Sequence, residues 1–102
     1  MWLLHSSEPV GAPLKFRLRF GAVKTVGRAP RADFVVEAPL VSRLHCRLTA
    51  GDDTLEVVDL SSTNGTFVNG KRIKRAALKT GDRLRVGRVE LKVERRLMAN
   101  NG

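Results

Sequence analysis

Hydroxyl and amide side chains are concentrated between residues 59 and 70, in the sequence Asp-Leu-Ser-Ser-Thr-Asn-Gly-Thr-Phe-Val-Asn-Gly. Small hydrogen-bonding groups beside Gly65, which adopts backbone conformations closed to other residues, are typical of a turn. Such a turn can present hydrogen-bond donors to an anion. Within it we expect Asp59 to cap loop amides and Gly65 to serve the loop geometry.

Two other segments carry cations and a hydroxyl. Arg28 follows Gly27 at the end of one predicted strand, and Ser42, Arg43 and His45 stand at the start of another. Alternation along that second strand would put Ser42 and Leu44 on one face and Arg43 with His45 on the other, although entry into a strand can bend that rule. Because an arginine can donate two parallel hydrogen bonds to phosphate oxygens, the three segments together predict a phosphate clamp.

The same residues also have a structural interpretation. Most surface arginines are simply solvated, and Thr63 and Asn64 can satisfy the backbone of their own loop. For His45 we favour a structural role, in which it hydrogen-bonds neighbouring backbone. A hydrolase built on Ser42 and His45 lacks the Gly-x-Ser-x-Gly elbow and an acid to orient the histidine. We therefore predict that the protein is not an enzyme.

Composition limits the possible classes of protein. The chain has 102 residues, 42% of them hydrophobic, and we predict one domain over residues 1–96 followed by a flexible tail over residues 97–102. No apolar run approaches the roughly 18 residues of a membrane span. We expect no membrane segment and a cytoplasmic protein, or a nuclear one if the source is eukaryotic. Cys46 and two histidines cannot form a closed zinc site, so we expect no metal and no cofactor.

A formal net charge of +9 attracts anions such as nucleic acid, acidic lipid or a phosphorylated protein. A basic nucleic-acid-binding domain is therefore an alternative function. Against it, at least three of the aromatic residues occupy alternating positions that face inward, so the stacking platform of single-strand binders is missing. The aromatic residues are Trp2, Phe16, Phe20, Phe34 and Phe67.

Apolar and polar residues alternate in many short segments, which predicts half-buried β-strands. Closely spaced turn signals indicate antiparallel connections, and hence an all-β sandwich or small barrel. Asn69-Gly70 predicts a two-residue hairpin, because both positions of that turn need positive φ. The expected strands are 2–4, 15–20, 23–27, 34–36, 43–49, 54–59, 65–68, 71–74, 77–78, 83–86 and 89–95.

The motifs resemble those of the forkhead-associated (FHA) domain, a phosphothreonine-binding module. Order, spacing and identity agree for Gly27-Arg28, Ser42-Arg43-Leu44-His45, the segment from Ser62 to Gly70, and Gly81-Asp82. The resemblance extends from about residue 2 to residue 95. It implies an eleven-stranded antiparallel β-sandwich whose loops at one end bind a phosphopeptide.

The resemblance also implies roles for individual residues. Arg28 and Ser42 are expected to contact the phosphate, Arg43 to add a second cation, and Thr63 to complete the pocket. These four residues form the expected phosphate-binding set.

The remaining implied roles concern the peptide and the scaffold. Asn64 is expected to hold the peptide main chain, while Gly27 and His45 are architectural. Leu40 stands at the position that helps select the side chain three places after the phosphothreonine. An apolar residue here favours an apolar peptide residue over an acidic one.

The expected function is a non-enzymatic, phosphothreonine-dependent interaction module. Its partner is a protein phosphorylated by a Ser/Thr kinase, or a phosphorylated segment of its own larger chain. The expected ligand is therefore a phosphothreonine-containing protein or peptide, and nucleic acid is the disfavoured alternative.

Overall fold

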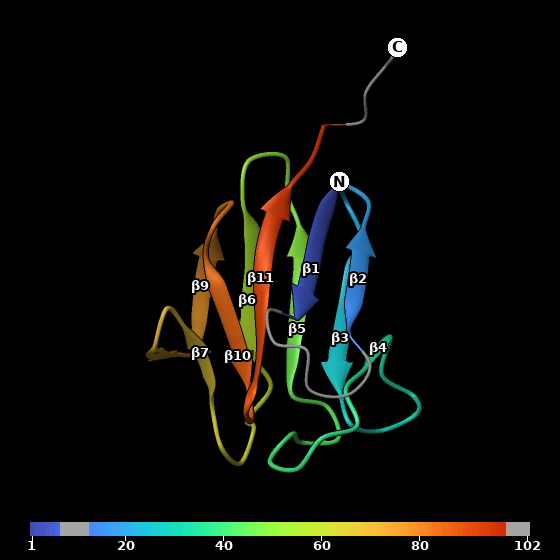
Figure 1. The fold of residues 1–102 in the computed structure, drawn as a ribbon, viewed down its shortest axis with the longest axis vertical. Helices are drawn as coiled ribbons and strands as arrows, with labels where there is room; N and C mark the ends of the chain where they lie inside the picture. The colour runs from blue at the N-terminus through green and yellow to red at the C-terminus, as the bar shows by residue number, and fades with distance from the viewer. Residues whose placement is uncertain (7–12, 98–102) are drawn as a thin grey trace.

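The computed structural model describes residues 1–6 and 13–97, which form two β-sheets packed face to face (Figure 1). The strands are β1 (Trp2–Ser6), β2 (Lys15–Leu18), β3 (Val23–Gly27), β4 (Phe34–Val35), β5 (Cys46–Ala50), β6 (Leu55–Asp59), β7 (Thr66–Val68), β8 (Lys71–Ile73), β9 (Arg75–Leu78), β10 (Arg83–Val86) and β11 (Val89–Arg95). The predicted eleven-stranded all-β sandwich is confirmed. Of the predicted tail, all but Leu97 lies outside the described residues. Within the described ranges, no helix is long and apolar enough to cross a membrane.

Alternation turns one side of each sheet into a shared core. The six-stranded sheet has the order β2-β1-β11-β10-β7-β8, and the five-stranded sheet has the order β4-β3-β5-β6-β9. Leu48 on β5 pairs with Val57 on β6, and both are fully buried. Each such side chain contributes roughly 1.5–3 kcal/mol by its removal from water. The Trp2 indole N–H donates to the Gly51 carbonyl at 2.8 Å. The shared core therefore fixes where the connecting loops begin and end.

One strand pair departs from the predicted antiparallel arrangement. β4 runs parallel to β3, with Phe34 opposite Val26. The physical reason is Asp33, whose carboxylate accepts hydrogen bonds from the Thr25 N–H at 2.9 Å and the Thr25 hydroxyl at 3.1 Å. These bonds from Thr25 also hold the pKa of the Asp33 carboxyl below its usual range. The contact between Asp33 and Thr25 brings the chain back beside β3, so that β4 runs in the same direction as β3.

The segment predicted to begin a strand at residue 43 is instead a loop. β5 begins only at Cys46, and the four residues before it cross over Gly27. There the Arg28 N–H donates to the Ser42 carbonyl at 2.9 Å. A Cβ on Gly27 would lie 2.0 Å from the Arg43 carbonyl oxygen, so this crossing needs glycine. The predicted alternation of side chains from Ser42 onward was wrong, because this backbone bonds to the end of β3 outside the strand register.

The predicted Asn69-Gly70 hairpin is confirmed. It joins β7 to β8 with φ angles of 50° and 83°, as a turn of this type requires. The Asn69 Oδ1 accepts the Arg83 N–H at 3.0 Å, and its Nδ2 donates to the Asp82 carboxylate at 3.0 Å. Asn69 therefore joins the turn to the beginning of β10.

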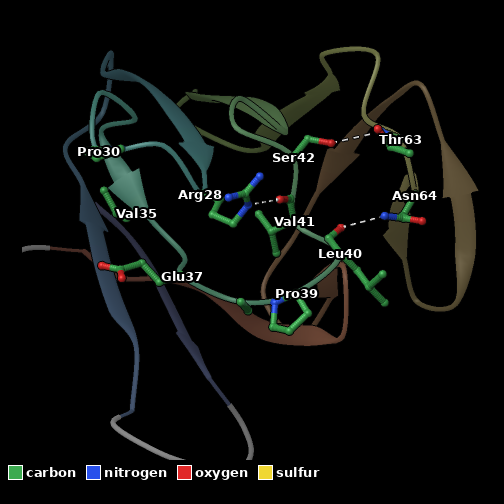
Figure 2. A pocket seen from close by; sticks show the side chains of 11 residues that line it. Arg28, Pro30, Val35, Glu37, Pro39, Leu40, Val41, Ser42, Thr63 and Asn64 are labelled. Atoms are coloured by element: carbon green, nitrogen blue, oxygen red, sulfur yellow. Dashed lines mark hydrogen bonds between the residues drawn. The ribbon is translucent and has the colours of Figure 1, made fainter.

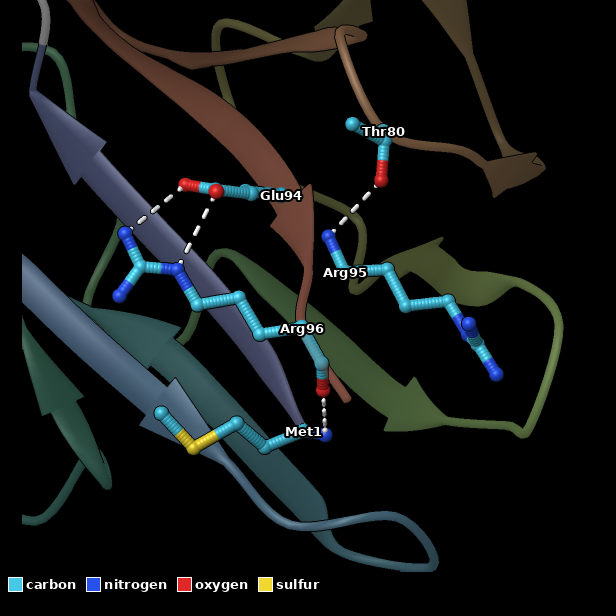
Figure 3. Close-up of polar contacts among 5 residues, drawn as sticks. All are labelled: Met1, Thr80, Glu94, Arg95 and Arg96. Atoms are coloured by element: carbon cyan, nitrogen blue, oxygen red, sulfur yellow. Dashed lines mark hydrogen bonds and ion pairs between the residues drawn. The ribbon is translucent and has the colours of Figure 1, made fainter. Parts of the chain in front are cut away.

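The beginning of β1 and the end of β11 lie side by side (Figure 3). The Met1 amino group donates to the Arg96 carbonyl at 2.6 Å, and the Arg96 N–H donates to the Met1 carbonyl at 2.8 Å. Thr80 Oγ1 accepts the Arg95 N–H at 2.9 Å, and Glu94 pairs with the Arg96 guanidinium at 3.1 Å. In Figure 1 this end of the sandwich lies opposite the β4–β5 and β6–β7 connections.

Gly27→Ala is expected to destabilise the domain by roughly 3 kcal/mol, because the methyl would overlap the Arg43 carbonyl and displace the crossing loop. Urea unfolding followed by circular dichroism measures this loss. Gly21→Ala is the matched control: its φ is +91° and no atom lies within 4 Å of an added Cβ. That variant should carry only a backbone strain of about 1–2 kcal/mol. Equal losses in the two variants would contradict the steric explanation.

Candidate functional site

An open hollow of about 930 Å³ lies at the loop end of the sandwich (Figure 2). Its walls come from the β3–β4 connection, the β4–β5 connection and the β6–β7 connection. Four of the predicted ligand-binding residues and the predicted selectivity residue line it. These are Arg28, Ser42, Thr63, Asn64 and Leu40. Segments far apart in the sequence therefore line one hollow.

Arg28 is held in place by a backbone carbonyl. Its Nε–H donates to the Val41 carbonyl at 3.0 Å. Among the described residues, the two terminal guanidinium nitrogens have no hydrogen-bond partner, so their donors remain for a ligand. A guanidinium group is a cation with donors in a planar fork. The β3–β4 connection thus places the Arg28 guanidinium beside the hollow, with two nitrogens free to donate hydrogen bonds.

Ser42 and Thr63 meet across two different loops. The Ser42 Oγ accepts the Thr63 N–H at 3.0 Å, which leaves the Ser42 hydroxyl hydrogen free to donate elsewhere. The Thr63 side chain is exposed and lines the same hollow. Together with Arg28, these groups place a guanidinium and two hydroxyls around one space.

His45 connects the same two loops from beneath. It is fully buried; its Nδ1 accepts the Ser42 N–H at 3.0 Å, and its Nε2 lies 2.8 Å from the Gly65 carbonyl oxygen. Because Nδ1 accepts, the hydrogen must lie on Nε2, which donates to Gly65. The structural role favoured for His45 matches these contacts, and Ser42 Oγ is not its hydrogen-bond partner.

Asp59 organises the loop that carries Thr63. Its carboxylate accepts from the Ser62 N–H at 3.2 Å, the Ser62 hydroxyl at 2.5 Å and the Thr66 hydroxyl at 2.7 Å. Burial alone raises the pKa of Asp59, but the hydrogen bonds from Ser62 and Thr66 outweigh it and leave the pKa below its usual value. The Ser62 Oγ in turn accepts the Gly65 N–H at 3.0 Å. Asp59 therefore contacts a loop amide, as expected of a capping residue.

Asn64 and Leu40 lie next to each other in the lining of the hollow. The Asn64 Nδ2 donates to the Leu40 carbonyl at 3.1 Å, which leaves its Oδ1 and one N–H for a ligand. Leu40 has φ of 71°, a conformation that costs a non-glycine residue about 1–2 kcal/mol. The residue is 45% exposed. An apolar side chain is thus held in solvent at the edge of the hollow.

Other predicted residues lie elsewhere. Arg43 is exposed and does not line the hollow; its carbonyl accepts the Ala29 N–H at 3.1 Å. Asn69 and Gly70 form the hairpin turn and are absent from the walls of the hollow. Gly65 has φ of 90° and is buried behind the loop. These glycine and asparagine positions shape the loops.

Sequence reasoning assigned no individual role to several residues. Ser62 and Thr66 complete the bonding of Asp59, and their spacing of three and seven residues after an aspartate is a signal that a turn search could have used. Val35 and Glu37 line the hollow because β4 runs parallel to β3. No alternation pattern indicates that placement.

The described residues offer neither a reactive thiolate at Cys46 nor a cluster of side chains that could bind a metal ion. Burial, with a smaller contribution from Asp59, raises the pKa of the Cys46 thiol to about 12. It therefore stays protonated at neutral pH. Across residues 1–6 and 13–97, no group of three His, Cys, Asp or Glu side chains could hold a metal ion.

The family model of the FHA domain matches residues 24–87, which include the walls of the hollow. The chain belongs to the FHA family.

Solved structures and sequence relatives of this FHA domain agree with that assignment. The FHA domain of the CT664 protein from Chlamydia trachomatis superposes with a TM-score of 0.87 at 26% identity, covering 94% of this chain and 98% of that chain. EmbR from Mycobacterium tuberculosis, solved in complex with a low-affinity phosphopeptide, has a TM-score of 0.77 at 26% identity, covering 91% of this chain and 24% of that chain.

A sequence relative is the oxoglutarate dehydrogenase inhibitor of Corynebacterium efficiens. It is 37% identical over 67 residues, which are 66% of this chain and 47% of the relative. The FHA domain described here thus spans about half the length of that protein.

The stability of the domain should fall in acid partly through Asp59. Its folded-state pKa is lowered, so the unfolded state binds more protons, and the stabilisation present above about pH 4 is lost as pH falls through the folded value. Asp59→Asn should cost roughly 2 kcal/mol at pH 7 and show a shallower decline below pH 5. Urea unfolding at pH 7, 5, 4 and 3 measures both.

Asp53→Asn is the control, because Asp53 is exposed and has no hydrogen-bonded carboxylate among the described residues. It should follow the wild type at every pH. A decline of Asp59→Asn as steep as that of the wild type would refute this account.

Proposed function

We propose that this FHA domain is a non-enzymatic module that binds phosphothreonine-containing segments of other proteins. The observation that carries the proposal is the convergence of Arg28, Ser42 and Thr63 on one hollow, with spare donors on each side chain. The partner is a protein phosphorylated by a Ser/Thr kinase, or a phosphorylated segment of a longer chain containing this domain. A cytoplasmic location, where such kinases act, is part of the proposal.

The chemistry of the hollow suits a phosphate ester. A phosphothreonine carries about −1.5 to −2 charges at pH 7 and three acceptor oxygens. The guanidinium of Arg28 supplies charge and two donor nitrogens, and Ser42 and Thr63 supply hydroxyls. Each charge-assisted hydrogen bond contributes roughly 1.5–3 kcal/mol, although such contributions do not add.

The hydrogen bonds inside the site also favour binding. Arg28 is already held by Val41, and Ser42 is already bonded to Thr63. Fixing these side chains before the ligand arrives reduces the conformational entropy lost on binding. Phosphothreonine differs from phosphoserine by one methyl, whose burial contributes only about 0.8 kcal/mol. Selection of threonine therefore depends on the shape of the hollow as well as on apolar area.

Asn64 is proposed to hold the peptide main chain with its free Oδ1 and N–H, because its other N–H is already bonded to Leu40. Arg43 is proposed to add a second cation once a phosphate is bound, since it directly follows Ser42 and its side chain is exposed. EmbR, with the same fold, binds a phosphopeptide, which supports this assignment.

The nucleic-acid alternative finds no support in these relatives, and the aromatic residues argue against it. Trp2 is fully buried, and Phe16 stacks on Phe34 with ring centroids 4.5 Å apart. The Arg85 guanidinium covers Phe67 at 4.0 Å from the ring centroid. Bases therefore find no open row of aromatic rings on which to stack.

Arg28→Ala should weaken binding of a phosphothreonine peptide at least about thirtyfold, because a truncated charge partner costs 2 kcal/mol or more. Ser42→Ala should also weaken binding. The peptide is first selected from a degenerate phosphothreonine library, and affinities are then measured by fluorescence anisotropy with phosphorylated and unphosphorylated forms.

Arg31→Ala is the matched control for Arg28, since Arg31 lies in the same connection, is exposed and does not line the hollow. It should bind almost as the wild type does. Thermal unfolding checks that each variant is folded. Phosphate-independent binding, or no binding from the library, would refute the proposed function.

Leu40 is proposed to select an apolar peptide residue, and a pair of variants separates this role from its backbone strain. Leu40→Gly and Leu40→Ala both remove the side chain and should lose preference for an apolar residue three places after the phosphothreonine. Leu40→Gly should be more stable than Leu40→Ala by about 1 kcal/mol, because only glycine adopts φ of 71° without strain. Library profiles and urea unfolding measure the two effects. An unchanged profile in both variants would rule out selection by Leu40.

A further inference from the structure

The hollow contains a carboxylate as well as a cation. Arg28 and Glu37 are the charged side chains among the described residues that line it. Glu37 is exposed and lies just after β4, at the start of the β4–β5 connection. The three ion pairs in the described part of the chain involve other glutamates, so the Glu37 carboxylate has no cation within 4.0 Å there. An exposed carboxylate is ordinary on a protein surface, but Glu37 lines the same hollow as Arg28.

Glu37 lies on one side of Arg28 in the lining of the hollow. Figure 2 shows Glu37 near Val35 on one side of Arg28, and Asn64 on the opposite side. The volume of about 930 Å³ is in the upper range of ligand pockets, far more than one phosphorylated side chain fills. A peptide with its phosphate at Arg28 and its main chain at Asn64 therefore has room to continue toward Glu37.

The surroundings of Glu37 suit a long basic side chain. Val35, Ala38 and Pro39 line the hollow next to it and offer apolar contact to a methylene stem. Lysine and arginine place such stems along apolar surface while the charged head stays in water. The Glu37 carboxylate would then receive the ammonium or guanidinium group. Because both partners are exposed, the gain is that of a surface ion pair.

Glu37 places a negative charge in the lining of the hollow, whereas the net charge of the whole domain is positive. A net charge of +9 attracts any acidic peptide, whether or not its sequence is correct. Discrimination between partners can come from a repulsive contact against the wrong one as well as from attraction to the right one. A carboxylate in the wall disfavours acidic residues locally, where the long-range field would otherwise favour them.

We infer that Glu37 makes this site select phosphothreonine segments that carry lysine or arginine on the side of the phosphothreonine away from the part held by Asn64. The inference rests on the proposed function and adds a charge requirement to it. It identifies the ligand as a segment with a phosphate and a basic side chain, spaced to span the hollow.

The test uses peptides built on the best sequence from the phosphothreonine library. Each of the three positions before and after the phosphothreonine is replaced in turn by Lys, Ala and Glu, and affinity is measured by fluorescence anisotropy. At one or more positions on one side, the wild type should bind Lys over Glu by about tenfold, combining attraction and repulsion of the size found for exposed pairs. Glu37→Gln should remove this preference, and Glu37→Lys should reverse it.

Glu56→Gln is the matched control, because Glu56 is a surface glutamate on β6 that pairs with Arg75 at 3.7 Å and lies outside the hollow. It should keep the wild-type order of preference. Circular dichroism checks that the Glu37 variants are folded; Glu37 has no hydrogen bond or ion pair in the described part of the chain to lose.

The outcomes separate this inference from the proposed function. Phosphate-dependent binding with the same order of preference in the wild type and Glu37→Gln would overturn the inference and leave the proposed function intact. A preference for Glu over Lys on both sides of the phosphothreonine would also overturn it. No phosphate-dependent binding in the wild type would overturn both.

Discussion

The buried imidazole of His45 joins the two loops on which the site depends. It accepts the Ser42 N–H and donates to the Gly65 carbonyl, and it has no exposed surface. In the absence of water, each of these backbone groups would be left unsatisfied without it, at a cost of about 1–3 kcal/mol each. The meeting of Ser42 Oγ with the Thr63 N–H follows from this contact. The neutral imidazole of His45 thus holds the loop that carries Ser42 at a fixed distance from the loop that carries Thr63.

Arg28, Ser42 and Asn64 each use part of their hydrogen-bonding capacity on the scaffold and leave the rest free. Arg28 uses Nε on Val41 and keeps its terminal nitrogens, whereas Asn64 uses one N–H on Leu40 and keeps the rest of its amide. Because Ser42 accepts through its oxygen, its hydrogen remains available. The donors are therefore oriented by the protein before any anion arrives, and the binding free energy need not offset their ordering.

Much of this arrangement could be predicted from the sequence, because local rules govern it. Alternation and turn signals together located the strands of the described residues, and the paired positive φ of Asn69 and Gly70 follows from turn chemistry. The loop from Ser42 to His45 was mistaken for the start of a strand, since its shape depends on Gly27 in a distant segment. The parallel pairing of β4 depends on the contact between Asp33 and Thr25, which alternation does not indicate. Sequence reasoning thus failed where backbone from one segment sets the path of another.

Net charge and local charge act at different distances in this domain. The field of +9 acts over about a Debye length, roughly 8 Å at physiological salt, and speeds encounter with any anion. This long-range field does not distinguish one anionic sequence from another. Because the Arg85 guanidinium covers the Phe67 ring, that ring is not open for a nucleic-acid base to stack on. Recognition therefore depends on contacts shorter than the screening distance, inside the hollow. There, in the function that we propose, the order and spacing of hydroxyl, amide and carboxylate groups on the loops that His45 joins would determine which anionic segment binds.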